Sequence, residues 1–332
     1  MATHDIITVG ASAGGIQTLE RFVDLLPPDL PAAILIVQHL HPRTPSTLDH
    51  ILTRTSKLPT AFARDGQPIE HGHIYIAPPD NHLLVEPGRI RVVRGPRENR
   101  HRPAVDPLFR SAAWTYGPRV VGVVLSGTLD DGASGLWASR TCGGVTVVQD
   151  PAEALHSEMP TSALMALNVD HCLPLAGIAT LLQQLAHETA PEPRKTPLPE
   201  PLGLEVAATM REKDTDVEDM RKLGQPAGFS CPACHGGLWE LTEGELTVYR
   251  CHIGHAYAPE SLQLAQALEV ERALETALRA LEEQAATARR LGQRLEDRVP
   301  ALATRYEAQS AGLEERAAVI RNLLRNGFKP ND

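Results

Sequence analysis

Short apolar runs alternate with amphipathic stretches between residues 5 and 190. The runs predict buried strands, because strands covered on both faces are apolar along their whole length. They cover residues 5–10, 32–37, 73–77, 120–125 and 145–148. Leu83–Val93 reads as a hairpin that turns at Pro87-Gly88.

The stretches between these runs predict helices. Ile16, Leu19, Val23 and Leu26 fall on one face of a helix that Pro27 and Pro28 end, and a second helix is expected near residues 133–142. Apolar strands separated by helices predict an α/β fold: a doubly wound, mostly parallel, Rossmann-like sheet. In such sheets, functional sites lie at the carboxyl ends of the strands.

The pattern changes near residue 191. A proline-rich connector at 191–201 should be stiff and extended, a short charged helix is expected within 204–223, and cysteines and histidines cluster at 228–258. Leucine and alanine then recur at heptad spacing over 274–295; Pro300 breaks this helix, and a second helix over 302–324 should pack back on it. The predicted domains are 1–190 (catalytic), 191–226 (linker), 227–258 (zinc-ribbon-like module) and 259–328 (helical hairpin or coiled coil).

Composition narrows the class of protein. The 332 residues carry a net charge of −9, which argues against nucleic acid as the main partner. No apolar run approaches the length of about 20 residues that spans a bilayer, so membrane insertion is not expected. The first residues lack the features of a signal peptide, and five cysteines are too few for a disulfide scaffold. We expect a cytoplasmic protein.

Ser12 is a candidate nucleophile. The first strand runs into Gly10-Ala-Ser-Ala-Gly-Gly15 and then a helix, so Ser12 should be exposed at the carboxyl end of the strand. The alternative is a loop that cradles a phosphate or a dinucleotide, and a dinucleotide site requires an acid at the end of the second strand. That strand ends in Gln38-His39 instead. Because adjacent strands lie about 4.8 Å apart, His39 can reach Ser12 and act as a general base.

A third residue is needed to orient the imidazole. Asp130 and Asp131 follow the strand at 120–125, and either carboxylate could accept the Nδ1–H of His39. The other is expected to cap the helix at 133–142.

Several motifs occur in the order of one known family. The motifs are Gly10–Gly15, Gln38-His39, Ile74–Pro79, Val105–Phe109, Leu125–Gly132 and Met159-Pro160. Together they resemble the catalytic domain of the chemotaxis-receptor methylesterase (CheB) family over residues 5–185. The resemblance implies a serine hydrolase that removes methyl esters from receptor glutamates and deamidates receptor glutamines, without a catalytic cofactor. A methyl-accepting chemotaxis receptor is the implied partner.

The resemblance also implies roles for particular residues. Ser12 matches the nucleophile, His39 the base and Asp131 the orienting acid, which leaves Asp130 as a cap or bystander. Backbone N–H groups of Ala13 and Thr128 would hold the oxyanion. Thr128 stands where the family usually has Met, and Ala13 where it often has Thr or Ser. The chain starts at the catalytic strand, so we expect a stand-alone form without the family's receiver domain.

The cysteine segment has the spacing of a zinc ribbon. Cys231-Pro-Ala-Cys234 and Cys251-His-Ile-Gly-His255 supply three thiolates and an imidazole, with a hairpin between them at Glu243-Gly244. His255 is preferred over His252 as the fourth ligand, because neighbouring side chains on a strand point apart. Four protein ligands predict a structural Zn(II). Cys142 and Cys172 are expected in the core.

Three interpretations stay open. Seven arginines between Arg89 and Arg110 form either a solvated hairpin face or a docking patch for acidic receptor helices. The terminal helices either pack only on each other or mediate a dimer or partner contact. Instead of an enzyme, the chain could be a non-catalytic signalling adaptor that binds receptor helices through an esterase-like fold.

Overall fold

The computed structural model describes residues 2–326 except 43, 193–199, 211–216 and 244–245. It divides into two compact units, Met1–Leu262 and Gln263–Asp332. Most of the predicted proline-rich connector, turn residue Gly244 and the last two residues of the predicted domain 259–328 lie outside the described residues.

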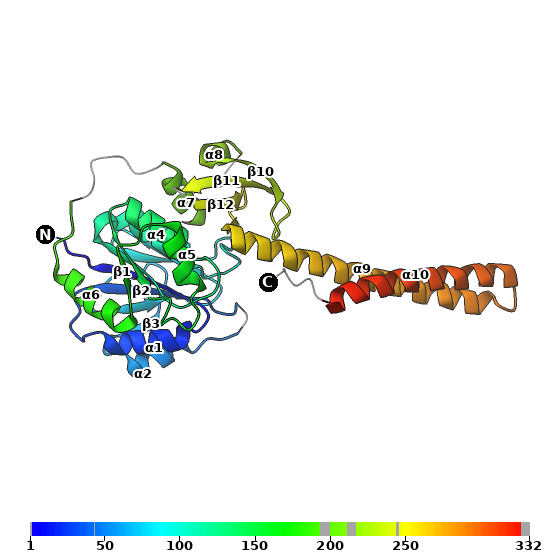
Figure 1. The fold of residues 1–332 in the computed structure, drawn as a ribbon, viewed down its shortest axis with the longest axis horizontal. Helices are drawn as coiled ribbons and strands as arrows, with labels where there is room; N and C mark the ends of the chain where they lie inside the picture. Colours follow the sequence, from blue (N-terminus) through cyan, green and yellow to red (C-terminus); the bar gives the residue numbers. More distant parts are fainter. Residues whose placement is uncertain (1, 43, 193–199, 211–216, 244–245, 327–332) are drawn as a thin grey trace. The chain divides into compact units, whose positions relative to one another are not determined.

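A seven-stranded parallel sheet forms the centre of the first unit (Figure 1). The strand order is β3-β4-β2-β1-β7-β8-β9. The strands are β1 (Ile6–Ala11), β2 (Ala33–Gln38), β3 (Thr60–Phe62), β4 (Ile74–Ile76), β7 (Val120–Val124), β8 (Val145–Gln149) and β9 (His171–Leu173). The predicted doubly wound sheet is confirmed, and every strand pair in it is parallel. Because Gly10 pairs with both Val37 and Val124, the ends of β2, β1 and β7 lie side by side.

Helices cover both faces of this sheet (Figure 1). One face packs against α1 (Gly15–Leu25), α2 (Leu48–Thr55) and α6 (Leu175–His187), and the other against α3 (Val105–Tyr116), α4 (Ala133–Thr141) and α5 (Glu158–Ala166). Leu19, Val23 and Leu26 are buried as predicted, but Ile16 is 39% exposed. Ile16 lies in the first turn of α1, which follows the end of β1 and so extends past the sheet.

Shorter elements complete this part of the first unit. The predicted hairpin is β5 (His82–Glu86) and β6 (Arg89–Val93), and a short 3₁₀ helix covers Gly117–Arg119. The sequence pattern missed β3 and β9, which are three-residue strands at the sheet edges. Cys142 is buried, but the expectation for Cys172 is wrong: its side chain is exposed because β9 is an edge strand.

A small antiparallel sheet forms the Cys/His module. Its strands are β10 (Gln225–Ser230), β11 (Gly237–Glu243), β12 (Leu246–Cys251) and β13 (Ala256–Tyr257). Before it come α7 (Glu200–Met210) and α8 (Val217–Leu223). Part of the expected linker is packed, since Val206 and Met210 of α7 are buried against Leu84. The domain boundaries near 190, 226 and 258 remain a prediction.

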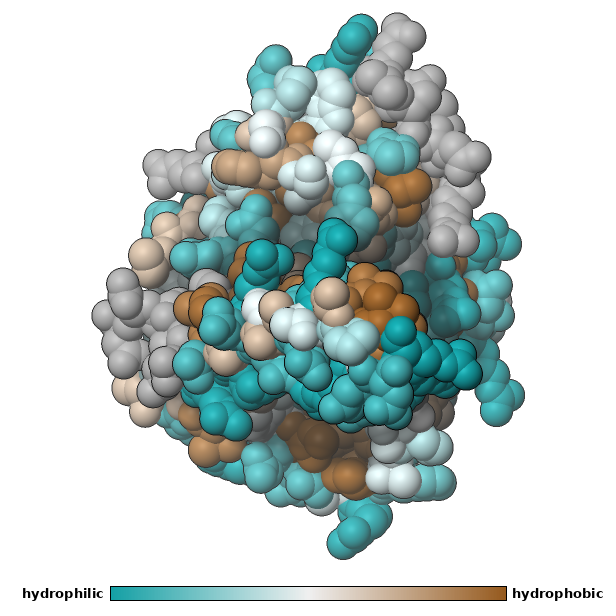
Figure 2. Space-filling model, turned by 90° about the vertical axis from the view of Figure 1, so that its right-hand side faces the viewer, coloured by the Kyte–Doolittle hydropathy of each residue, from teal (hydrophilic) through white to brown (hydrophobic). Residues whose placement is uncertain are grey.

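Two long helices, α9 (Pro259–Leu295) and α10 (Pro300–Asn326), form the predicted antiparallel hairpin. Ser310 on α10 donates a hydrogen bond to the carbonyl of Ala285 on α9 (3.0 Å), and both residues are buried. Among the described residues, no helix has the length and apolar character needed to cross a bilayer. On the face that Figure 2 shows, hydrophobic residues stand in small groups among hydrophilic ones.

Candidate active site

The loop after β1 places Ser12, which is half-buried, at the carboxyl end of the strand. Gly14 has a φ of 68°, a left-handed conformation that favours glycine, and it precedes the first turn of α1. A Cβ on Gly15 would lie 2.0 Å from Oε1 of Gln38, so a larger residue there would displace the Gln38 side chain. The Nε2 of Gln38 donates to the carbonyls of Ser12 (2.8 Å) and His39 (3.1 Å). Gln38 therefore fixes the backbone of Ser12 and His39 relative to each other.

Ser12, His39 and Asp131 form one hydrogen-bonded chain. The Ser12 hydroxyl lies 2.9 Å from Nδ1 of His39, and Nε2 of His39 lies 2.7 Å from Oδ2 of Asp131. The structure brings these three residues together, but the sequence analysis expected the opposite ring orientation, with Nδ1 facing the carboxylate. With Nε2–H donating to Asp131, Nδ1 is left with a lone pair that can accept the serine proton.

The carboxylate of Asp131 is buried and held on both oxygens. Main-chain N–H groups of Val105 and Asp106, at the start of α3, donate to Oδ2 and Oδ1 at 2.7 and 3.2 Å. The side-chain amide of Asn99 donates to Oδ1 at 3.0 Å. Burial alone would raise the pKa of Asp131, but the hydrogen bond and charge of His39, together with these other donors, hold it well below its usual range. Asp131 is therefore an ionised acceptor for the imidazole.

The sequence analysis missed three residues that surround Ser12, His39 and Asp131. Asn99 bridges Asp131 and Asp106, its Nδ2 lying 2.8 Å from Oδ2 of Asp106. His101 stacks on the ring of His39. Asp106 accepts the N–H groups of Gly132 and Gly135 at the start of α4. The only signal was local: Asn99 and His101 lie in a polar stretch just before the Val105–Phe109 motif.

One interpretation of the sequence expected the Asp130 side chain to cap α4, but the structure shows that it does not. Its carboxylate instead accepts the hydroxyl (2.5 Å) and main-chain N–H (3.3 Å) of Ser261, in the first turn of α9. The cap of α4 is supplied by Asp106, because Gly132 and Gly135 donate to it. Burial, followed by the hydrogen bond with Glu260, raises the pKa of Asp130 to about 7.

Two loops meet at Ser12. The N–H of Ser12 donates to the carbonyl of Ser126 (2.9 Å), and the Ser126 hydroxyl donates to the carbonyl of Ala13 (2.9 Å). A Cβ on Gly127 would lie 2.9 Å from Cβ of Ser12. Within the described part of the chain, the N–H groups of Ala13 and Thr128 donate to no protein atom. Both groups are thus available to a ligand.

The arginine stretch forms neither a wholly solvated face nor a bare positive patch. Arg110 is buried and pairs with Glu98, and Arg102 pairs with Asp80 at 2.6 Å. Arg91 pairs with Glu86 at 2.7 Å. The acidic partners come from segments before and within the stretch, so their proximity could not be seen in a local count of charges.

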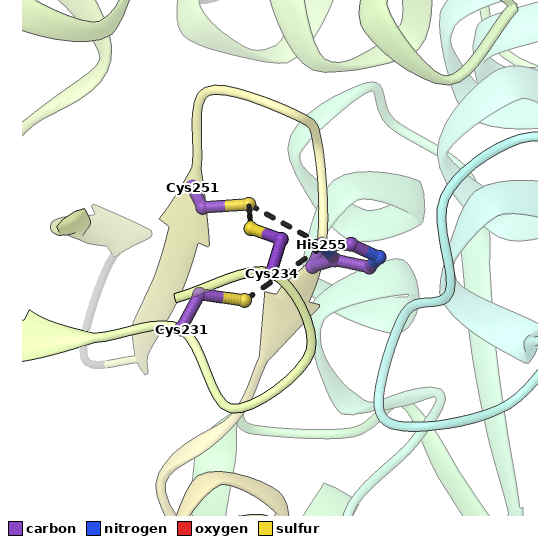
Figure 3. Close-up of side chains that lie close together, drawn as sticks. All are labelled: Cys231, Cys234, Cys251 and His255. Carbon is purple, nitrogen blue, oxygen red and sulfur yellow. Dashed lines mark hydrogen bonds between the residues drawn. The ribbon is translucent and has the colours of Figure 1, made fainter. Parts of the chain in front are cut away.

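A second cluster joins Cys231, Cys234, Cys251 and His255 (Figure 3). Their ligand atoms all lie within 4.8 Å of one another. Sγ of Cys234 lies 3.6 Å from Sγ of Cys251, and Nδ1 of His255 lies 3.7 and 3.6 Å from Sγ of Cys231 and Cys251. A zinc ion with bonds of about 2.3 Å to sulfur and about 2.05 Å to nitrogen requires edges near 3.8 and 3.6 Å. The predicted ligand set could therefore hold a metal ion, with His255 as the histidine.

The fold and the first cluster define a class of protein. A serine, a histidine and a buried aspartate, joined in that order at the carboxyl ends of neighbouring strands, are the arrangement found in serine hydrolases. The family model of the CheB methylesterase matches residues 7–182, which is more than half of the chain. The chain belongs to the CheB methylesterase family.

Known relatives agree over the same region. A "protein-glutamate methylesterase/protein-glutamine glutaminase 2" of Rhizobium johnstonii is 39% identical over 181 residues, which are 53% of this chain and 49% of that protein. A Leptospira interrogans protein provisionally given the same name without the numeral is 37% identical over 183 residues, 55% of this chain and 95% of its own. This chain thus spans about half the length of the first relative and nearly all of the second.

A solved structure is similar as well. The crystal structure of the Thermotoga maritima CheB methylesterase catalytic domain aligns with a TM-score of 0.52 and 32% sequence identity, and covers 55% of this chain and 98% of that one. The part that follows residue 182, including the Cys/His module and the helical hairpin, lies outside the match to the family model.

Proposed function

We propose that this protein is a protein-glutamate methylesterase that uses Ser12 as nucleophile, His39 as general base and Asp131 as the residue that orients His39. The hydrogen-bonded chain from Ser12 through His39 to the ionised Asp131 carries the proposal. The substrates are methylated glutamate side chains of chemoreceptors, and receptor glutamines are deamidated by the same route. The protein acts in the cytoplasm, where the modified region of such receptors would be accessible.

The reaction divides into two displacements. The Ser12 hydroxyl attacks the ester carbonyl while its proton passes to Nδ1 of His39, and the N–H groups of Ala13 and Thr128 stabilise the oxyanion. The tetrahedral intermediate collapses, and the methoxide takes the proton from His39 and leaves as methanol. Water then attacks the glutamyl–enzyme, giving its proton to His39, and Ser12 is released with that proton restored. With glutamine the leaving group is ammonia.

The surroundings of Ser12 support a protein substrate. Leu155 is 60% exposed and lies against the Gly14 turn, where a Cβ on Gly14 would meet its Cβ at 2.8 Å. Ile16, four residues after Ser12, is also exposed. Exposed apolar side chains at the nucleophile offer contact area to a receptor helix that carries the modified glutamate.

Methanol release from a methylated receptor tests this function. Ser12→Ala and His39→Ala should lower the rate by about a thousandfold or more, because each removes a member of the proton-transfer chain. The matched control is His41→Ala, which removes an exposed histidine two residues after His39 and should retain the wild-type rate. Equal release by Ser12→Ala and wild type would contradict the proposal and favour a non-catalytic adaptor.

The Cys/His cluster is proposed to hold one structural Zn(II). Its four ligands fill a tetrahedron, so they would leave no position for a substrate or water. Native mass spectrometry should find one zinc ion per chain, and Cys234→Ser should lose it. Retention of a full equivalent by a variant with both Cys234 and Cys251 replaced would place the metal elsewhere.

A further inference from the structure

One loop contacts both the candidate active site and the Cys/His module. This bridging loop, residues 94–104, connects β6 to α3. It belongs to the CheB-matching part of the chain, whereas the module follows that part by more than forty residues. The two sets of contacts meet at a single residue, Asn99.

The module binds the bridging loop through β13. The N–H of Asn99 donates to the carbonyl of Ala256 (2.8 Å), and the N–H of Ala258 donates to Oδ1 of Asn99 (2.9 Å). Ala256 directly follows His255, a member of the metal-ligand set. The N–H of Cys251 in turn donates to the carbonyl of His255 (3.0 Å). The backbone that supports Asn99 is therefore continuous with the backbone of two ligands.

Buried charges strengthen the same junction. Glu98 lies beside Arg110 of α3 and Arg250 of β12, and Nη2 of Arg250 is 3.2 Å from the Glu98 carboxylate. All three side chains are nearly inaccessible to solvent. Although burial opposes ionisation, the two guanidinium groups lower the pKa of Glu98 to about 2. Arg250 is adjacent to Cys251, so this contact also connects the loop to the ligand segment.

On the other side, the loop contacts the residues of the candidate active site. Nδ2 of Asn99 donates to Oδ1 of Asp131 at 3.0 Å. The ring of His101 lies parallel to that of His39. Because Oδ1 of Asn99 accepts the Ala258 N–H, the amide can present only its NH₂ group to Asp131. The position of Ala258 thus sets the orientation of the donor that reaches Asp131.

We propose that Asn99 is a positioning residue through which metal bound at Cys231, Cys234, Cys251 and His255 supports the geometry of Asp131, so that activity depends on occupancy of the metal site. This inference rests on the proposed function. A tetrahedral Zn(II) fixes the turn between Cys251 and His255 and thereby the start of β13. When the metal leaves, the ligand turn is no longer constrained, and Ala256 and Ala258 no longer hold the Asn99 amide in place.

The expected effect is on catalysis rather than on substrate binding. Asp131 keeps the N–H donors of Val105 and Asp106 when Asn99 is displaced, so the site persists in a weakened form. Loss of one hydrogen bond to a charged carboxylate corresponds to about a tenfold change. We therefore expect kcat to fall about tenfold with KM nearly unchanged.

The first experiment removes zinc from the full-length protein with a high-affinity chelator and then restores it. Metal content is measured by atomic absorption, kcat and KM by methanol release, and order at the junction by amide hydrogen exchange. Loss of zinc should lower kcat about tenfold and speed exchange at Asn99 and Ala258, while the amides of β7 stay protected; added Zn(II) should reverse both changes. Unchanged kcat in protein shown to be zinc-free would overturn the proposal.

The second experiment uses variants that keep the metal site intact. Asn99→Ala should retain one zinc, lower kcat about tenfold at unchanged KM, and respond little to the chelator because the connection is already broken. Arg97→Ala is the matched control, since Arg97 lies in the same loop with an exposed side chain, and it should behave as wild type. If removal of zinc unfolds the protein, the proposal is tested by comparing zinc-loaded Asn99→Ala with zinc-loaded Arg97→Ala. A wild-type kcat in Asn99→Ala overturns the proposal.

These results are distinguishable from failure of the proposed function. That function fails if Ser12→Ala keeps full activity in the zinc-loaded protein, whatever the chelator does. The coupling fails, with the esterase intact, if Ser12→Ala is inactive but Asn99→Ala is unaffected or loses as much activity as wild type on zinc removal.

Discussion

The imidazole rings of His39 and His101 lie face to face, with centroids 3.7 Å apart and 9° between the ring planes. Burial, followed by repulsion from His39, lowers the pKa of His101 to about 3. His101 is therefore neutral, and its ring stacks on that of His39, the proposed base. This arrangement ties the stability of the fold to pH, because His101 would titrate freely in the unfolded chain.

Replacement of His101 by phenylalanine should reduce the loss of stability in acid. Between pH 6.5 and about 3 the unfolded chain binds a proton at His101 that the folded chain does not, so wild type loses up to about 1.4 kcal/mol per pH unit as the pH falls. His101→Phe keeps a stacked ring without the titration. Urea unfolding at pH 7.5 and 4.5 measures the difference; a decline equal to that of wild type would contradict it.

Asp130→Asn should show a pH dependence of the opposite sign. The folded pKa of Asp130 is about 7 and the unfolded value is 3.8, so the folded state retains a proton that the unfolded state has released as the pH rises from 4 to 7. Wild type loses stability over this range, by roughly 1–3 kcal/mol in total. An asparagine can accept from Ser261 and donate to Glu260 at every pH.

The measurement is again urea unfolding, at pH 5 and pH 8. All three tryptophans, Trp114, Trp137 and Trp239, lie in the first unit, so their fluorescence reports on the unit that contains Asp130. The free energy of unfolding of Asp130→Asn minus that of wild type should be larger at pH 8 than at pH 5, because wild type alone loses stability as the pH rises. The same difference at both values would show that Asp130 does not titrate as stated.

Much of this arrangement could be predicted from local sequence. Ser12, His39 and Asp131 each follow a strongly apolar strand, and strands that are parallel bring their carboxyl ends to one edge. The Cys/His cluster was equally predictable, because Cys231 and Cys234 share one turn and Cys251 and His255 another. In both cases a local feature, the end of a strand or a tight turn, places each side chain.

The remaining features depend on packing between distant segments. Asn99 donates to Asp131, which lies 32 residues further along the chain, and accepts from Ala258, which lies 159 residues further on. No periodic pattern or motif in the sequence indicates either contact. The ring orientation of His39 likewise depends on the position of the Asp131 carboxylate, which no sequence pattern predicts. The ion pair between Arg102 and Asp80 also joins distant segments, so it could not be predicted from the arginine stretch itself.

Loss of Arg250 should destabilise the first unit strongly. Arg250→Met removes one guanidinium from a buried cluster and leaves that of Arg110 beside Glu98 and Glu205. Removing one partner from a buried ion pair costs about 3–5 kcal/mol. Arg21→Met is the control, because Arg21 pairs with Glu153 at an exposed position and such pairs contribute about 1 kcal/mol or less. Tryptophan-detected urea unfolding should separate the two variants clearly; similar values would mean that the buried cluster contributes little.

Gly127→Ala should impair catalysis more than stability. The added Cβ would lie 2.0 Å from Sδ of Met159 and 2.9 Å from Cβ of Ser12. The methionine is flexible and can move, but Cβ of Ser12 is fixed by the hydrogen bond from the Ser12 N–H to Ser126, so the loop that carries Thr128 must shift instead. An oxyanion donor displaced from its position costs about 10²- to 10³-fold in kcat.

Gly237→Ala is the matched control, because nothing lies within 4 Å of its added Cβ and its φ is ordinary. Methanol release should fall at least about a hundredfold in Gly127→Ala and remain at the wild-type rate in Gly237→Ala. Unfolding midpoints separate a shifted loop from a damaged fold. A Gly127→Ala protein with wild-type kcat would show that the Thr128 N–H does not contribute to the transition state, and the oxyanion would then need another donor besides Ala13.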